Sequence, residues 1–252
     1  MSTAPAPATV SLASPFAWLA AGWRDLWATP LASLAHGLLC AAFGALLVVL
    51  AGDRFWVLVG AFSGFMLVAP VIATGLYAMS RARELGRASG AARVAGIWGS
   101  FDRRLVLFGL GLAAAGTGWV FTSAALITAF AGAPIRAPID FVRQVMLAPS
   151  SFGLFEVWLL MGALLAAPVF ASSVIAMPLL VDRHDARVRD AILASWNAVI
   201  EQPGPCALWA ALIMGLVGIG LATALVGLIV VVPWLGHASW HAYRALAPRP
   251  AA

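Results

Sequence analysis

The stretch Leu67–Arg83, LVAPVIATGLYAMSRAR, decides the fold that we expect for this sequence. An apolar run meets Pro70, small residues and an aromatic residue follow, and the stretch ends in Arg81 and Arg83. An apolar helix of membrane-spanning length that ends in arginines is typical of a span whose basic end stays at the cytoplasmic surface. We therefore interpret this stretch as the second, returning helix of a membrane hairpin.

The same pattern recurs further along the chain. Aligning the last apolar segment on the first pairs Pro233 with Pro70, His237 with Thr74, Trp240 with Tyr77 and Arg244 with Arg81. A looser copy surrounds Pro168, with Ser172, Ser173 and Ile175 in the equivalent places. The pattern predicts three repeat units, at about 16–88, 91–189 and 190–249. The alternative is that helices rich in alanine and leucine resemble one another by composition alone.

Composition places the chain among polytopic membrane proteins. Hydrophobic residues make up 63% of the sequence and charged residues 10%, whereas soluble domains hold roughly 45–50% and ~25%. The 252 residues accommodate six spans of ~20 residues with short loops, which leaves no room for a separate soluble domain. The net charge of +5 comes from arginines without any lysine, and we interpret it as a topology signal rather than a nucleic-acid footprint.

Read in order, the chain divides into a tail and one membrane domain. Residues 1–15 are predicted to form a disordered tail, and residues 16–249 a single six-helix membrane domain. A tryptophan-rich helix at 16–27 is expected to lie on the membrane surface. The expected spans are 31–51, 55–79, 105–130 and 154–181, with two more inside 206–243. Short helices are expected near 139–147 and 186–200, whereas 81–104 reads as a polar loop.

The last apolar stretch, Cys206–Tyr243, is long for one span and short for two. With six spans and both termini in the cytoplasm, twelve of the fifteen arginines lie inside and three, Arg54, Arg136 and Arg143, lie outside. A single span would move two further arginines outside, which agrees less well with the positive-inside rule. The sequence therefore predicts an all-α protein of six transmembrane helices, arranged as three hairpins with a pseudo-threefold repeat.

Four stretches of the chain resemble a bacterial family of predicted integral membrane proteins, classified as a domain of unknown function. These stretches are Gly22–Leu39, Gly64–Gly86, Ser172–Ala186 and Val231–Leu246. The resemblance implies a multi-pass protein of the bacterial inner membrane. Some members are labelled as similar to subunit I of cytochrome c oxidase. That subunit has twice as many spans and a defined set of haem and copper histidines, whereas this sequence holds four histidines in all.

Three histidines are candidates for binding a cofactor. His237 and His241 stand at i and i+4, on one face of the last helix, and His36 lies near the inner end of the first span. Neutral imidazoles at this spacing bind metals or haem. The alternative is a polar cluster that bonds to neighbouring helices or lipid headgroups. The residues between the pair do not make an HExxH motif, and no cofactor is expected on balance.

The prolines inside spans are candidates for kinks or for a substrate pathway. Pro70, Pro168 and Pro233 each remove a backbone donor, and Thr74 and Ser172 one turn later are placed to satisfy freed carbonyls. Broken helices at corresponding repeat positions mark binding sites in transporters.

An acid at the outer end of the fourth span, Glu156, is a further candidate. An intramembrane acid is a candidate functional group by default. Its position near the helix end also allows it simply to reach the interface.

These observations favour a non-enzymatic membrane protein that acts as an accessory, assembly or scaffold component through helix and lipid contacts. Its expected partners are membrane lipids, attracted by the arginine-rich loops, and another membrane protein complex, but no nucleic acid. The alternatives are a small-solute transporter or channel with a site near the helix prolines, and a haem or metal protein associated with respiration. We find no phosphate-binding glycine loop, nucleophile elbow or catalytic carboxylate pair.

Overall fold

The computed structural model describes residues 10–51, 72–147 and 153–247, and all secondary structure in these residues is helical. Within them, four helices are long and apolar enough to cross a membrane: Pro30–Leu50, Arg103–Phe130, Leu154–Asp182 and Pro203–Ala222. Most of the expected span 55–79, with Pro70, lies outside the described residues, as does most of the predicted tail. The final part of that span forms a helix over residues 72–84.

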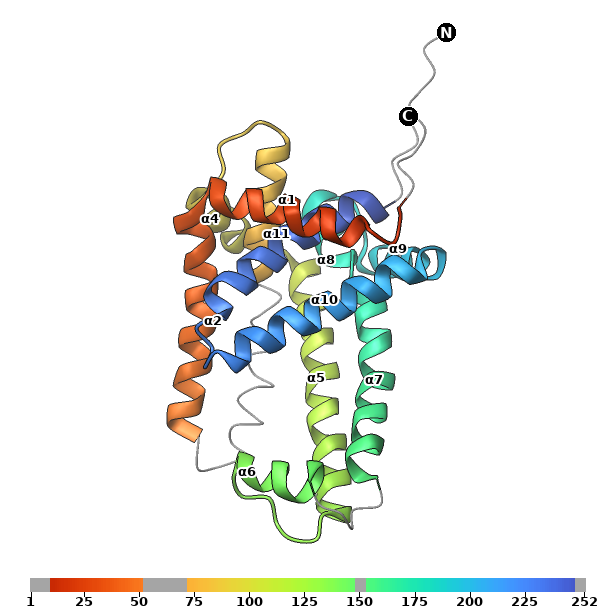
Figure 1. Ribbon diagram of the computed structural model, residues 1–252. Helices are drawn as coiled ribbons and strands as arrows, with labels where there is room; N and C mark the ends of the chain where they lie inside the picture. Colours follow the sequence, from red (N-terminus) through yellow and green to blue (C-terminus); the bar gives the residue numbers. More distant parts are fainter. Residues whose placement is uncertain (1–9, 52–71, 148–152, 248–252) are drawn as a thin grey trace.

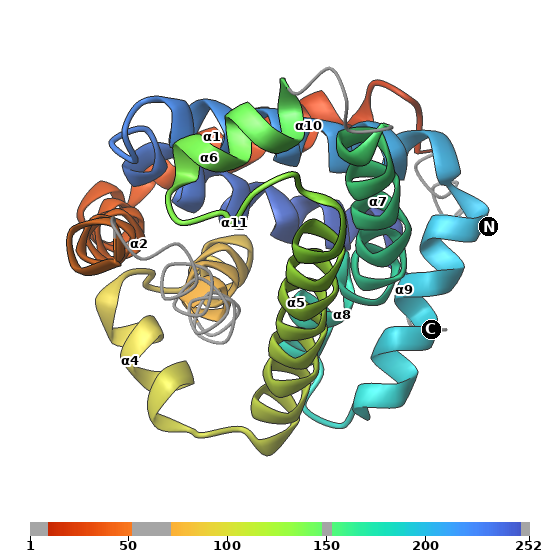
Figure 2. The ribbon, with the colours of Figure 1, turned by 90° about the horizontal axis from the view of Figure 1, so that it is seen from below.

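Three of the long helices share one direction. Figure 1 shows α2 (Pro30–Ala51), α5 (Arg103–Phe130) and α7 (Leu154–Ser173) along one common direction. The view along that direction, in Figure 2, shows α5 and α7 adjacent and α2 set apart from them. Their exposed faces are rich in large apolar side chains, which a lipid bilayer would cover.

Short helices gather at the two ends of this arrangement. At one end lie α1 (Ser14–Ala28), α4 (Ala91–Gly99), α8 (Ala176–Asp182) and α9 (Val188–Glu201), and at the other lies α6 (Pro138–Phe141), continued by a π-helical turn at Val142–Met146. Of the fifteen arginines, Arg54 and Arg249 are not described, and of the remaining thirteen only Arg136 and Arg143 belong to the α6 end. We call the opposite end the arginine end.

The stretch Cys206–Tyr243 forms two helices, α10 (Pro203–Ala222) and α11 (Leu228–Leu246). In Figure 1 this hairpin crosses the direction of α2, α5 and α7 instead of running beside them. Its turn contains Leu225, which lies against Gly44, the fifteenth residue of the twenty-two in α2. The pseudo-threefold set of parallel hairpins is thus not seen in the described part of the chain, and α11 is not among the four candidate spans.

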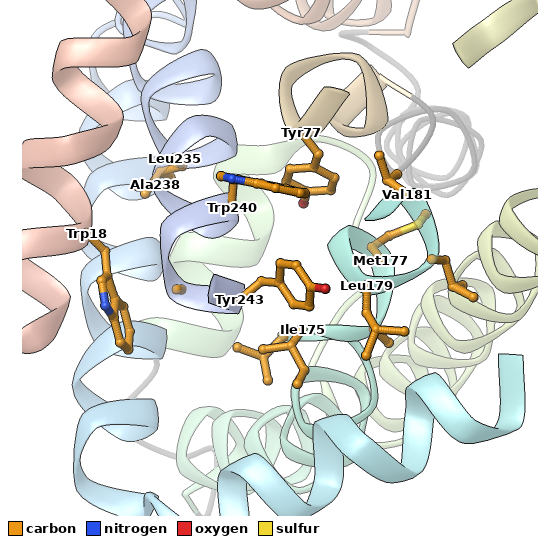
Figure 3. Close-up of a cluster of buried hydrophobic side chains, with 14 of the residues drawn as sticks. Trp18, Tyr77, Ile175, Met177, Leu179, Val181, Leu235, Ala238, Trp240 and Tyr243 are labelled. Atoms are coloured by element: carbon orange, nitrogen blue, oxygen red, sulfur yellow. The ribbon is translucent and has the colours of Figure 1, made fainter. Parts of the chain in front are cut away.

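The central packing element is α11. Figure 3 shows Trp18 of α1 on one side of α11 and Ile175 and Met177, before and within α8, on the other. Between them, Trp240 and Tyr243 of α11 are almost fully buried. Burying each large side chain contributes roughly 1.5–3 kcal/mol, so this helix is a core element whose sides are covered by protein.

Glycines let the neighbouring helices approach α11 closely. A methyl group added at Gly22 of α1 would collide with Ala238, one at Gly37 of α2 with the carbonyl of Ile229, and one at Gly236 with Leu76. Small residues serve this purpose at helix contacts in membranes because they allow close backbone approach. The α11 helix is therefore held by α1, α2 and the 72–84 helix at glycine contacts.

The interruption in the fourth expected span lies after Pro168, not at it. The α7 helix continues through Pro168 and ends at Ser173, and α8 begins at Ala176. Pro178 stands in the first turn of α8, and because it lacks an N–H it leaves the carbonyl of Val174 without a helical partner. Pro178 accounts physically for the break.

Several smaller expectations can be compared with the structure. The surface helix expected at 16–27 is α1, the helix expected near 186–200 is α9, and the one expected near 139–147 is α6 with its π-turn. One expectation was wrong, because the predicted polar loop 81–104 contains α4. Within α1, Trp18 is buried against Trp209, with ring centroids 5.7 Å apart.

The contact between α2 and α11 can be tested with matched glycine substitutions. We expect Gly37→Ala to lower the free energy of unfolding by about 1–3 kcal/mol, because the added methyl group overpacks the contact with Ile229. Gly111→Ala on α5 is the control, since nothing lies within 4 Å of its added methyl group. Unfolding midpoints in detergent, followed by circular dichroism, measure both, and equal effects would contradict the contact.

Candidate functional site

A buried polar cluster lies at the arginine end, where four helices meet. Its members are Asp25 from α1, Ser33 from α2, Ser80 from the 72–84 helix, and His237 and His241 from α11. Asp25 is 6% exposed, and Ser33 and His237 are fully buried. Polar groups removed from water must find partners to avoid a large desolvation cost, so the geometry of these five side chains decides what the cluster can do. We call it the Asp25 cluster.

The carboxylate of Asp25 accepts bonds from three side chains. Its Oδ2 accepts the Ser80 hydroxyl at 2.7 Å and lies 2.9 Å from Nε2 of His241. Its Oδ1 lies 2.9 Å from Nε of Arg83, a residue that is half exposed at the rim. Because a carboxylate only accepts hydrogen bonds, all three partners act as donors. The α1 helix is thereby connected to the 72–84 helix and to α11.

The positions of the protons in the cluster follow from counting hydrogen-bond donors and acceptors. The one hydroxyl hydrogen of Ser80 goes to Asp25, so Ser80 must accept at its 2.7 Å contact with Nδ1 of His237. Neutral His237 then carries its proton on Nδ1, and its Nε2 accepts the hydroxyl of Ser33 at 2.9 Å. The result is one directed chain of hydrogen bonds from Ser33 through His237 and Ser80 to Asp25.

The environment keeps Asp25 ionised. Burial favours the neutral acid, but the hydrogen bonds from His241 and Ser80 and the nearby histidines outweigh it, so the pKa of Asp25 lies below its ordinary value. A serine, a histidine and an aspartate in one chain of bonds resemble a hydrolytic triad. Here, however, Ser33 is fully buried and does not reach a substrate in this arrangement. The chain of hydrogen bonds instead connects the helices to one another.

The structure places His36 apart from this chain of hydrogen bonds. Its Nδ1 lies 2.7 Å from the carbonyl oxygen of Ala32, to which it must donate, because a carbonyl only accepts. Its Nε2 is buried without a hydrogen-bond partner among the described residues and faces Gly75. The indole of Trp98 lies beside the ring, at 5.4 Å between centroids.

The three histidines proposed as cofactor ligands therefore do not converge on one point. Both ring nitrogens of His237 face serine hydroxyls, and Nε2 of His241 faces Asp25. Within the ranges that the structure describes, no group of three or more histidine, cysteine, aspartate or glutamate side chains is placed to hold a metal ion. Both ring nitrogens of His237 and Nε2 of His241 thus face protein groups, whereas Nε2 of His36 has no hydrogen-bond partner among the described residues.

The kink and pathway candidates also lie outside the Asp25 cluster. Thr74 is buried, and Pro233 lies inside α11. The hydroxyl of Ser172 accepts a hydrogen bond from the Trp196 indole N–H at 3.0 Å. Glu156 is exposed in the first turn of α7, where the helix dipole favours an acid.

A second set of ionic contacts lies beside the cluster, and the sequence reasoning missed it. Asp182 accepts from Arg81 at 2.7 Å and from the Tyr243 hydroxyl at 2.7 Å. Glu84 accepts from the Trp240 indole and from Arg244, both at 2.9 Å. These contacts bind α11 to α8 and to the 72–84 helix.

Only part of this site carried a signal in the sequence. Asp25 interrupts the apolar run of residues 16–27, and an acid in such a run is costly unless it is paired. Ser33 and Ser80 carry no comparable signal, because serines are common in membrane helices and their partners lie 204 and 157 residues away.

The long apolar helices and the arginine end define a polytopic helical integral membrane protein. The profile of a family described as a predicted integral membrane protein family, DUF2189, matches residues 57–182, which is 126 of the 252 residues. The chain belongs to this family. No curated protein and no solved structure matches the chain. The match includes Ser80 and Arg83 but leaves α1, α2, α10 and α11 outside, so most of the Asp25 cluster comes from beyond it.

Replacing Asp25 tests the cluster. We expect Asp25→Asn to lower the free energy of unfolding by about 2–3 kcal/mol, because the amide keeps one accepting oxygen but loses the other, and a hydrogen bond to a charged group contributes roughly 1.5–3 kcal/mol. Asp185→Asn, at an exposed position, is the control and should change stability by less than about 0.5 kcal/mol. Denaturant unfolding in detergent measures both, and a stable Asp25→Asn protein would contradict the assigned role.

The contribution of Asp25 also depends on pH, with a defined sign. Because the native pKa is lowered, the carboxylate stabilises the fold above its ordinary pKa of about 3.9 and loses this effect as the pH falls through the native value. The stability difference between the natural protein and Asp25→Asn should therefore be full near neutral pH and shrink below about pH 4. Unfolding midpoints measured across this range test it, and a difference that grows on acidification would be inconsistent with it.

Proposed function

We propose that this protein is a non-enzymatic accessory or assembly component of a membrane protein complex, acting through helix contacts within the bilayer. The observation that carries the proposal is a pair of exposed faces made of small residues, one on α5 and one on α10. Helix partners in membranes approach each other at such faces, because there the gain comes from close packing rather than from excluding water.

The face on α10 follows the spacing of a helix contact. Ala207, Ala211 and Gly215 stand four residues apart, Gly218 extends the row, and all four are exposed. Nothing lies within 4 Å of a methyl group added at Gly215 or Gly218. The opposite face of α10 carries Trp209, which is buried in the core, so the small-residue row points away from the molecule.

The face on α5 is similar. Gly111, Ala114, Gly118 and Thr122 recur at helical spacing and are exposed, and nothing lies within 4 Å of a methyl group added at Gly111 or Gly118. Elsewhere in this chain, glycines such as Gly37 already lie against a neighbouring helix. The contrast supports the interpretation that the α5 and α10 rows serve a partner outside the chain.

We further propose a topology for the bacterial inner membrane, in which the arginine end faces the cytoplasm. Eleven of the thirteen described arginines supply the positive bias expected of cytoplasmic segments. In this proposal 55–79 completes the spans of α2, α5 and α7, and the α10–α11 hairpin enters and returns on the cytoplasmic side. Both termini are then cytoplasmic, as six spans would also require.

The proposed partner contact is tested by enlarging the small residues. We expect Gly118→Ile combined with Gly215→Ile to reduce co-purification of partner membrane proteins at least fivefold, because branched side chains block close helix approach. The measurement is quantitative mass spectrometry after native purification at endogenous expression. Leu164→Ile, on an exposed part of α7, is the matched control. An unchanged set of co-purifying proteins, with folding intact, would refute the proposal.

The proposed orientation is tested by labelling introduced cysteines with a membrane-impermeant maleimide. Ala91→Cys marks the arginine end and Arg136→Cys the α6 end, and both positions are exposed. The natural Cys40 and Cys206 are buried, so their background should be low. We expect intact cells to label position 136 alone, and cells with permeabilised membranes to label both. Labelling of position 91 in intact cells would show that the protein has the opposite orientation and would contradict the proposal.

A further inference from the structure

A cavity of about 480 Å³ lies among the helices below the arginine end. The 72–84 helix, α5, α7, α10 and α11 all contribute to its wall, with Tyr77, Trp119, Ala166, Trp209 and Ile213 among the lining residues. The volume falls within the ~300–1,000 Å³ that is usual for ligand pockets. It is therefore large enough to hold a substantial part of a small molecule.

The wall of this cavity is chemically apolar. Among its lining residues there is no aspartate, glutamate, arginine or histidine. The hydroxyls of Ser173 and Ser239 donate to the carbonyls of Val169 and Leu235 within their own helices, at 2.7 and 2.8 Å. Ser239 is also the partner of the Tyr77 hydroxyl. Since these hydroxyls are already engaged inside the protein, the cavity selects a ligand group without charge and without strong hydrogen-bonding atoms.

The cavity opens at the depth of the hydrocarbon core. The lining residues Ala115, Leu165 and Ala166 are exposed, and they stand near the middle of α5 and past the middle of α7. Met177 and Trp209, which also line the cavity, are buried. A molecule enters such an opening from within the bilayer rather than from water.

The length of the cavity wall indicates what kind of molecule fits. Along α7 the lining runs from Gly162 to Ser173, which spans about 16 Å at 1.5 Å per residue. Half of the ~30 Å hydrocarbon core is about 15 Å, the depth occupied by the acyl chain of one leaflet. The wall therefore matches a single extended lipid chain in length as well as in polarity.

We propose that this cavity binds one acyl chain of a bilayer phospholipid, held between α5, α7 and α10. On α10 the site is separate from the small-residue face, because the lining residues Trp209 and Ile213 lie on the side opposite Ala207 and Gly215. The acyl chain fills space that the protein's own side chains leave open, and the bilayer supplies it.

Photo-labelling of the full-length protein in lipid vesicles tests this site. The vesicles contain phosphatidylcholine and phosphatidylglycerol with a trace of phosphatidylcholine that carries a diazirine in mid-chain. After irradiation, mass spectrometry of peptides locates the adducts. We expect adducts to concentrate on lining residues of α5, α7 and α10, at least fivefold above those on the outer face of α7. An even distribution over all lipid-facing residues would overturn the proposal.

A pair of substitutions on α7 makes the test specific. Ala166→Phe fills the cavity and should reduce lining adducts at least fivefold, whereas Leu164→Phe, on the exposed opposite side of the helix, should leave them unchanged. Ile213→Trp fills the cavity from α10 and replaces Ala166→Phe if that variant unfolds. An unchanged number of adducts on the lining residues in a folded, cavity-filled variant would overturn the proposal. Labelling of the lining residues by a diazirine fatty acid, but not by the diazirine phospholipid, would overturn it as well.

Discussion

The buried carboxylate of Asp25 sets the constraint on which the arrangement of this protein depends. A charge removed from water is tolerated only where donors replace its hydration, and here the donors come from Ser80, His241 and Arg83. Supplying them requires α1, the 72–84 helix and α11 to meet at one point. His237 also accepts a hydrogen bond from Ser33, so α2 must reach the same point. Because α11 is fixed at this point, the path of α10, which precedes α11 in the chain, is restricted. The hairpin of α10 and α11 lies across α2, α5 and α7.

This convergence divides the molecule into a polar end and an apolar body. At the arginine end, Asp182 and Glu84 form ion pairs with Arg81 and Arg244, and Glu84 also accepts a hydrogen bond from the Trp240 indole of α11. Away from it, α2, α5 and α7 present large apolar side chains to the bilayer. The cavity lies where α10 crosses α5 and α7, because a crossing helix cannot fill the space along two parallel ones. The small-residue rows remain on the outside, available to a partner helix.

Much of the local structure could be predicted from the sequence, because it depends on local patterns. Membrane-spanning length, the start of α2 at Pro30 and the separate helix α1 follow from apolar runs, proline and tryptophan spacing. The role of α11 could not be predicted in this way. Its repeat-like spacing indicated a return span, but α11 crosses the other helices, and Trp240, Tyr243 and His237 are almost completely buried in protein. Hydrophobic periodicity indicates which residues share one face of a helix, but it does not indicate whether protein or lipid covers that face.

By itself, the sequence determined the class of the protein, its apolar helices, and the gathering of arginines toward one end, since these depend on composition and on residues near one another in the chain. Only the tertiary structure decided that Ser33, Ser80, His237 and Asp25 form one chain of hydrogen bonds. It also decided that the last hairpin crosses the others and leaves an apolar cavity. The hydrogen bonds of this chain join residues 55 to 204 positions apart, and the geometry of such contacts is set by how whole helices pack.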